Sequence, residues 1–299
     1  MARKAVEDGV DVHLLDGTYE LFRAFFGAPS RKHKDQEVGA VRTLLLSLNA
    51  WLRKGGVTHA ACAFDHVIES FRNDLFDGYK TGEGMEPDLY SQFTLAEEAV
   101  AALGIAVWPM VPFEADDAMA AAAHQLKSNQ QVRRVFLCSL DKDLGQCVEG
   151  DRIVMYDRVK DVTMNADGVL AKFGVTPAQI PDFLALVGDA ADGVPGISGF
   201  GAKGAAAVLT AHGSLEEIPS DPAKWKCKVR GAERLAANLA ADLKAARLYK
   251  TLTTLRTDVP IDASLPAIAW HGADRDAVDQ IALKLNDAEL ASRIVRFKN

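Results

Sequence analysis

The sequence predicts an α/β protein in which a mainly parallel sheet with flanking helices is followed by a helical module. Short apolar strands alternate with helical stretches from residue 10 to about residue 157, and this alternation is typical of a parallel sheet. After about residue 165 strand signals stop and helical signals continue. We therefore expect two domains, residues 1–170 and 171–299, with an irregular arch segment near residues 80–95 that could overhang a cleft.

The elements of the first domain follow from periodicity and capping signals. Strands are expected at Val10–Leu15, His59–Phe64, Ile105–Met110, Val135–Ser139 and Arg152–Tyr156. Helices are expected at Gln36–Lys54, Leu89–Leu103 and Asp116–Lys127. Aliphatic residues at three- and four-residue spacing indicate the first helix, Gly104 would cap the second, and the third carries acids in its first turn.

The helical module begins with a capping signal at Thr176, which precedes a proline at the first helical position. A helix should then run to about Val187. The turn-rich loop Gly188–Gly196 follows, and a second helix should start near Ala202.

Composition limits the class of protein. The chain has 299 residues, is 48% hydrophobic and carries a net charge of −7. Its four cysteines form no C-x-x-C pair, so a zinc site or disulfide framework is not expected. Residues 1–8 contain no apolar core for a signal peptide, and no apolar run reaches membrane-spanning length. We expect a cytoplasmic monomer with no membrane partner.

Carboxylates follow one expected strand after another. Because ligands bind outside the carboxyl ends of parallel strands, these acids should meet at one edge, where they could not all stay ionised without cations. Oxygen ligands of this kind suit two or more Mg²⁺ or Mn²⁺ ions. A single aspartate of this kind is usually a helix cap or turn residue, and Asp117 or Asp189 could be that alone. The full set of candidate ligands, including two acids of the later loop, is Asp16, Asp65, Glu114, Asp116, Asp117, Asp141, Asp143, Asp189 and Asp192.

Three further groups indicate contact with phosphate. A glycine-rich turn, with Gly199, Gly201 and Lys203, precedes a helix, where backbone N–H groups can approach an anion; the alternative is an ordinary interhelix turn. Residues 223–256 contain nine basic and only two acidic residues. This excess of positive charge indicates either a surface that binds the DNA backbone or a solvated helix face. Arg72 and Lys80, after the second strand, could neutralise a scissile phosphate, or Arg72 could be a surface charge. The bases that start the basic segment are Lys224, Lys226, Lys228 and Arg230.

These motifs resemble the 5′-to-3′ exonuclease domain of bacterial DNA polymerase I, a member of the flap endonuclease family. The resemblance runs from about His13 to Ile261. Its most specific parts are Glu114–Asp117, Asp141–Leu144, Gly188–Gly196 and the Gly199–Lys203 hairpin.

The resemblance implies a PIN-like (resolvase-like) nuclease domain and a helix–hairpin–helix-type element that grips duplex phosphates, often with bound K⁺. It implies one metal on Asp16, Asp65, Glu114 and Asp116, a second on Asp141, Asp143 and Asp192, and support from Asp117 and Asp189. It also implies that Lys80 is an active-site lysine and that Arg72 contacts substrate.

The chain departs from the family at Glu83, where a second basic residue is usual, and no polymerase sequence follows Asn299, so a stand-alone protein is expected. The expected function is a divalent-metal-dependent, structure-specific 5′ nuclease acting on branched, nicked or 5′-ended DNA. The alternatives are a DNA-junction binder whose nuclease has weakened, and a phosphatase with strand-end aspartates.

Overall fold

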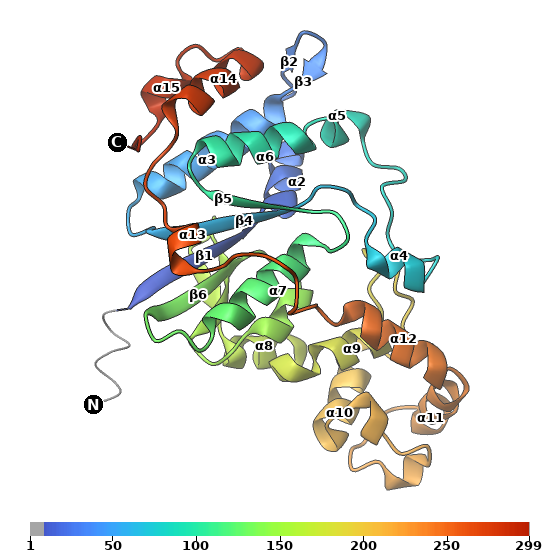
Figure 1. Ribbon diagram of the computed structural model, residues 1–299. Helices are drawn as coiled ribbons and strands as arrows, with labels where there is room; N and C mark the ends of the chain where they lie inside the picture. Colours follow the sequence, from blue (N-terminus) through green and yellow to red (C-terminus); the bar gives the residue numbers. More distant parts are fainter. Residues whose placement is uncertain (1–8, 299) are drawn as a thin grey trace. The chain divides into compact units, whose positions relative to one another are not determined.

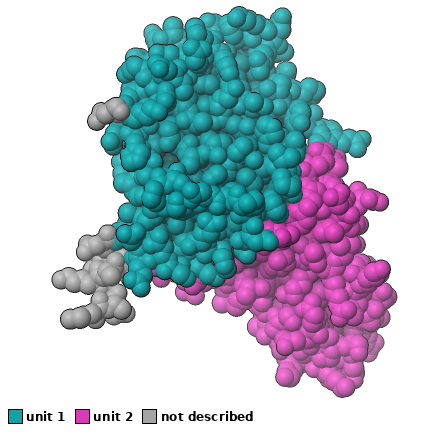
Figure 2. Space-filling view, viewed as in Figure 1, with its two compact units in different colours: residues 1–68, 82–139, 257–299 teal, residues 69–81, 140–256 magenta. Residues whose placement is uncertain are grey.

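The computed structural model describes residues 9–298 (Figure 1). Residues 1–8, on which the expectation about a signal peptide rests, lie outside the described part of the chain. Contacts divide the chain into two compact units (Figure 2). Unit 1 comprises residues 1–68, 82–139 and 257–299, and unit 2 comprises residues 69–81 and 140–256. The chain therefore passes from one unit to the other after Ile68, Thr81, Ser139 and Arg256.

Unit 1 contains a parallel four-stranded arrangement, as the sequence predicted. The strands are β1 (Val10–Asp16), β4 (His59–Asp65), β5 (Ala106–Met110) and β6 (Val132–Cys138). Their order is β5-β4-β1-β6, and each neighbouring pair is parallel. Central residues such as Leu14 and Ala61 are fully buried, as expected for strands covered on both faces. The register pairs Asp16 with Ala63, so the carboxyl ends of β1 and β4 lie at one edge.

Helices cover this sheet (Figure 1). The alanine-rich α7 (Ala115–Leu126) contacts all four strands, because its small buried side chains allow close approach. Another layer contains α2 (Gly17–Gly27), α3 (Gly39–Arg53) and α6 (Phe93–Ala102), which contact one another. The sequence did not predict α2, whose start directly follows Asp16.

Two expected helices of unit 1 differ from their sequence signals, one in its start and the other by a break. Gln36 and Glu37 form strand β3 (Gln36–Glu37), which pairs with β2 (Lys32–His33) across a turn with positive φ at Lys34 and Asp35. The helix therefore starts only at Gly39. The other expected helix is divided into α5 (Pro87–Tyr90) and α6, and Gly104 ends it with φ of +78°.

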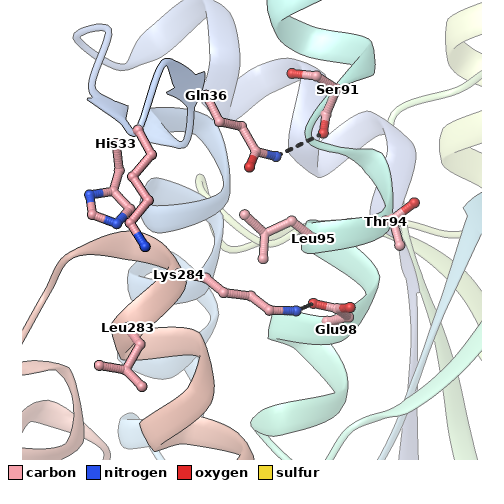
Figure 3. Close-up of a pocket in the computed structure, with 9 residues that line it drawn as sticks. His33, Gln36, Ser91, Thr94, Leu95, Glu98, Leu283 and Lys284 are labelled. Carbon is pink, nitrogen blue, oxygen red and sulfur yellow. Dashed lines mark hydrogen bonds and ion pairs between the residues drawn. The ribbon is translucent and has the colours of Figure 1, made fainter.

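The C-terminal segment belongs to unit 1 and forms α13 (Leu265–Ile268), α14 (Arg275–Leu285) and α15 (Leu290–Arg293). Helix α14 packs against α6, and Lys284 forms an ion pair with Glu98. Between these helices and the β2–β3 hairpin lies a cavity of about 400 Å³ (Figure 3). Its lining includes Leu95 and Leu283 but none of the strand-end acids.

Unit 2 is mainly helical, as expected for the later part of the chain. It contains α4 (Phe71–Leu75), η1 (Asp143–Cys147), the antiparallel pair β7 (Ile153–Asp157) and β8 (Val162–Met164), α8 (Ala166–Phe173), η2 (Pro177–Gln179), α9 (Ile180–Val187), α10 (Ala202–His212), η3 (Leu215–Glu217), η4 (Pro222–Lys224), α11 (Ala232–Ala241) and α12 (Leu243–Thr253). Helix α9 packs against α10 and α12. Thr176 caps the turn before α9, as predicted, but that turn is a 3₁₀ helix. Within residues 9–298, every helix falls short of the length and apolar character needed to cross a bilayer.

Candidate functional site

The acids of unit 1 follow three neighbouring strands. Asp16 ends β1, Asp65 ends β4, and Glu114 follows β5 at the start of α7. Backbone and hydroxyl donors hold the first two carboxylates. Asp16 accepts from the Tyr19 backbone N–H at 2.8 Å and from the Ser139 hydroxyl at 2.9 Å. Asp65 accepts from the Ala115 backbone N–H at 2.7 Å, which ties β4 to the N-terminus of α7.

The other acids of α7 differ in burial and in contact. Asp117 is fully buried and accepts a hydrogen bond from the Glu114 backbone N–H at 3.0 Å. Asp117 therefore helps to cap the start of α7, the alternative role that the sequence suggested for it. Asp116 is half-buried in the first helical turn. Sequence reasoning missed Ser139, whose position one residue after β6 is the signal that could have identified it.

Unit 2 holds a compact carboxylate cluster. Oxygen atoms of Asp143, Asp189 and Asp192 lie within 4.8 Å of one another, and we call these three residues the triad. Among the described residues this is the only such group of metal-ligating side chains. Asp143 begins η1, and the other two lie in the loop between α9 and α10. Asp141 is not a member, but it accepts a hydrogen bond from the Asp143 backbone N–H at 2.9 Å.

Two lysines offset the charge of the triad. Lys80 contacts Asp192 at 2.9 Å, and Lys142 contacts Asp189 at 2.7 Å. Burial would lower the pKa of Lys142, but its hydrogen bond with Asp189 and the charges around it raise that pKa overall. Sequence reasoning missed Lys142, although its place between two aspartates is a signal that could have identified it.

Asp143 is the most perturbed member of the triad. Burial, followed by the charges of Asp141, Asp192 and Asp189, raises its pKa well above the ordinary range, and Lys80 offsets only part of this effect. Its Oδ1 is buried and accepts no hydrogen bond from the described residues. A buried carboxylate oxygen beside two further carboxylates matches the oxygen ligands that hard divalent cations prefer. The triad therefore fits a divalent metal ion.

Lys80 and Arg72 belong to the segment Glu69–Thr81, which is part of unit 2. The Lys80 side chain is half-buried against Asp192. The Arg72 side chain is 1% exposed, and its Nε donates to the Leu252 carbonyl at 2.7 Å. Tyr79, the residue before Lys80, is itself buried.

The glycine-rich turn lies between α9 and α10. Gly199 has φ of +88°, and the Ser198 carbonyl accepts from the Asn238 side chain at 2.8 Å. Gly201 caps α10 with extended backbone, and a Cβ there would meet no atom within 4 Å. Gly201 and Lys203 are both exposed, so the N-terminus of α10 is open to an anion.

The basic residues of unit 2 gather first in a loop rather than on a helix. Lys224 ends η4, and the following bases lie before α11 begins at Ala232. All four are exposed, and we call them the basic loop: Lys224, Lys226, Lys228 and Arg230. The later bases Lys244, Arg247 and Lys250 lie on α12, where Lys250 is half-buried and paired with Asp182 and Glu216.

A parallel sheet with acids at its strand ends, together with a helical unit containing a carboxylate cluster and a glycine-rich turn, is the architecture of a resolvase-like nuclease chain. Two family models match it: "5′-3′ exonuclease, N-terminal resolvase-like domain" over residues 11–174, and "5′-3′ exonuclease, C-terminal SAM fold" over residues 175–276. The chain belongs to the 5′-3′ exonuclease family, which confirms the resemblance and the fold class expected from the sequence.

The sequence is similar to bacterial DNA polymerases I. It is 37% identical over 273 residues to that of Rhizobium leguminosarum, which covers 88% of this chain and 26% of the polymerase. It is 34% identical over 288 residues to that of Mycobacterium leprae, which covers 94% of this chain and 31% of the polymerase. The chain therefore spans about a quarter to a third of the length of these relatives.

Solved structures share the fold at low identity. The T5 D15 protein co-crystallised with metal ions has a TM-score of 0.66 at 17% identity, with 94% of this chain and 99% of that one covered. The catalytic core of Rad2 in complex with DNA substrate has a TM-score of 0.63 at 15% identity, with 97% and 93% covered. At these identities the likeness establishes the fold alone.

Proposed function

We propose that this protein is a divalent-metal-dependent, structure-specific 5′ nuclease that hydrolyses phosphodiester bonds in nicked, branched or 5′-ended DNA. The observation that carries the proposal is the triad, with Lys80 on one of its carboxylates, in a chain of the 5′-3′ exonuclease family. Support comes from its relatives, since a T5 D15 structure contains metal ions and a Rad2 structure contains DNA substrate.

The chemistry follows from the charges of unit 2. The triad would hold Mg²⁺ or Mn²⁺, which supplies positive charge to the scissile phosphate and lowers the pKa of water. Lys80 adds a fixed ammonium beside Asp192, where it can stabilise negative charge that develops on phosphate. Asp141 holds the backbone of Asp143 in place through its hydrogen bond, so it acts on the position of a ligand.

In unit 1, we assign a second cation to Asp16, Asp65, Glu114 and Asp116, with Asp117 in support through its cap of α7. For DNA, the turn with Gly199, Gly201 and Lys203 and the basic loop would contact duplex phosphates without reading bases. Carbonyls of the turn would also suit K⁺. We also propose that the protein acts as a monomer in the cytoplasm.

A cleavage assay tests this function. A 5′-labelled flap duplex with Mg²⁺ should yield short labelled products from the protein as given. The pair Asp141→Asn with Asp143→Asn should lower cleavage by at least about 100-fold and spare duplex binding. The triad loses one carboxylate ligand and the neighbouring carboxylate that holds it in place, and repulsion toward phosphate falls. A titration with Mn²⁺, monitored by the spectroscopic signal of the free ion, should show that this variant binds one class of Mn²⁺ ions fewer than the unaltered protein.

The matched control is Glu149→Gln with Asp167→Asn, which removes two exposed charges elsewhere in unit 2. It should leave cleavage and Mn²⁺ binding unchanged. Cleavage near the unaltered level in the Asp141 and Asp143 variant would refute the metal assignment. Tight junction binding without cleavage would favour the weakened junction binder, and turnover of small phosphate esters would favour the phosphatase.

A further inference from the structure

Arg72 is a buried cation that contacts the carboxyl end of helix α12. It lies on α4, its side chain is 1% exposed, and it donates to the carbonyls of Leu252 at 2.7 Å and Thr254 at 3.3 Å. These carbonyls belong to the end of α12, where the helix dipole favours positive charge. The guanidinium also lies 4.6 Å from the centre of the Phe71 ring. A buried arginine is tolerated only when its donors are satisfied, and here they fasten α4 to α12.

From α4 the chain leads directly to Lys80. The Asn73 side chain donates to the Lys80 carbonyl at 2.9 Å. Tyr79 packs with Val194 and with Leu252, whose carbonyl accepts from Arg72. The segment that presents Lys80 is therefore fixed from both sides, by α4 and by the end of α12.

Lys80 is in turn attached to the loop that carries Asp192. Its backbone N–H donates to the Asp192 carbonyl at 3.0 Å, and its Nζ contacts the Asp192 carboxylate at 2.9 Å. Gly193 makes this approach possible, because a Cβ there would lie 2.1 Å from the Gly78 carbonyl oxygen and its φ is +75°. Displacement of this segment would move the ammonium away from the triad.

We propose that Arg72 is a positioning residue, which holds the Lys80 ammonium against the triad from α12 and does not contact substrate phosphate itself. This revises the role that the family resemblance implied for Arg72, and it rests on the proposed nuclease function. For Arg72 to contact a phosphate, its guanidinium would have to break its hydrogen bonds with the carbonyls of α12 and become exposed.

A double-mutant cycle tests the proposal on the flap substrate with Mg²⁺. Arg72→Met should lower kcat by about 10- to 100-fold with little change in KM, because a misplaced group costs rate more than binding. Lys80→Met should lower kcat to a similar degree. In the Lys80→Met background, Arg72→Met should cost less than about 2-fold, since the two changes remove the same effect.

Asn73→Ala provides a milder variant in case Arg72→Met does not fold. It removes the bond to the Lys80 carbonyl and the bond from the Ser70 N–H that caps α4, and it leaves the buried Arg72 in place. Its smaller effect on kcat should also vanish in the Lys80→Met background. Arg42→Met is the matched control, because it removes an arginine paired with Asp287 in unit 1. Its effect should multiply with that of Lys80→Met.

Hydrogen exchange gives a readout that does not depend on catalysis. Arg72→Met and Asn73→Ala should speed exchange of the Tyr79 and Lys80 amides, which are hydrogen-bonded in the structure, and Arg42→Met should not. Three outcomes would indicate direct phosphate contact by Arg72 and overturn the proposal. They are multiplicative effects of Arg72→Met and Lys80→Met on kcat, a higher KM for Arg72→Met, and a slope of log affinity against log salt that Arg72→Met lowers by about 0.9. An intact protein that cleaves no DNA would refute the proposed function, whereas the exchange experiment would still decide whether Arg72 anchors the segment.

Discussion

His13 should make the stability of unit 1 depend on acid. Its imidazole lies in β1, 9% exposed, stacked 4.8 Å from the Phe136 ring and edge-on to Trp51 at 5.2 Å. Burial lowers its pKa from the ordinary 6.5 to about 4, and the charge of Asp11 offsets only part of this. The neutral ring is therefore the form that the fold accepts.

The sign and size follow from this difference. Between pH 6.5 and 4 the unfolded chain binds more protons at His13 than the folded chain, so stability falls as pH falls through this window. Above pH 6.5 the contribution is fully present, and below pH 4 no more is lost. The full loss is about 3 kcal/mol, and the loss at pH 5 relative to pH 8 is about 2 kcal/mol.

Urea unfolding at pH 8 and pH 5 measures this loss. His13→Phe keeps an aromatic ring between Phe136 and Trp51 but cannot take up a proton, so its unfolding free energy should fall by about 2 kcal/mol less than that of the unaltered protein. His124→Gln, which changes an exposed histidine on α7, should behave like the unaltered protein. Identical pH dependence in all three proteins would refute the assignment of His13 as a buried neutral group.

Three further predictions concern DNA. Gly201→Val should weaken binding to a nicked duplex about 10-fold and leave Mn²⁺ affinity unchanged. Because the Gly201 backbone is extended, the valine side chain acts by blocking the approach of phosphate and not by straining the backbone. Equal duplex affinity of the variant and the unaltered protein would mean that this loop is only a turn. Alanine at all four positions of the basic loop should lower the slope of log affinity against log salt by up to about 3.6, and an unchanged slope would place DNA elsewhere. Glu83→Arg should raise flap cleavage several-fold at low salt, because about 1 kcal/mol of repulsion toward an entering 5′ strand is relieved. The gain should be smaller at high salt and on a nicked duplex, which has no long 5′ strand to pass this segment. Equal gains on both substrates would mean that Glu83 does not lie near the entering strand.

The sequence predicted those elements whose local signals agree with their packing. The strands that end at Asp16 and Asp65 are apolar runs buried in a parallel sheet, and the acids after them occupy its carboxyl edge as expected. Helix α3 was placed too early, because residues 36–37 have helical neighbours in sequence but pair with β2 in space. Tertiary pairing of that kind leaves no local signal.

The site was predicted unevenly for a similar reason. Strand position and motif order named nine acids as candidates, and three of them lie together in the triad. The buried place of Arg72 depends on α12, about 180 residues away, and no spacing rule connects two such positions. Sequence reasoning can name the residue types that chemistry needs, but which of them meet depends on how distant segments pack.

The repeated passage of the chain between its units constrains how it can be made. Unit 1 is completed only by residues 257–299, and its Glu98–Lys284 ion pair joins positions 186 residues apart. At about 5–20 residues per second, a ribosome reaches Lys284 on the order of 10 s after the last strand of this unit has emerged. During that interval the face of α6 that receives α14 stays exposed to water and to other nascent chains. A break after residue 174, between the two matched family models, would likewise leave α14 and α15 on the fragment that carries α9 to α12, and neither fragment would contain a complete unit.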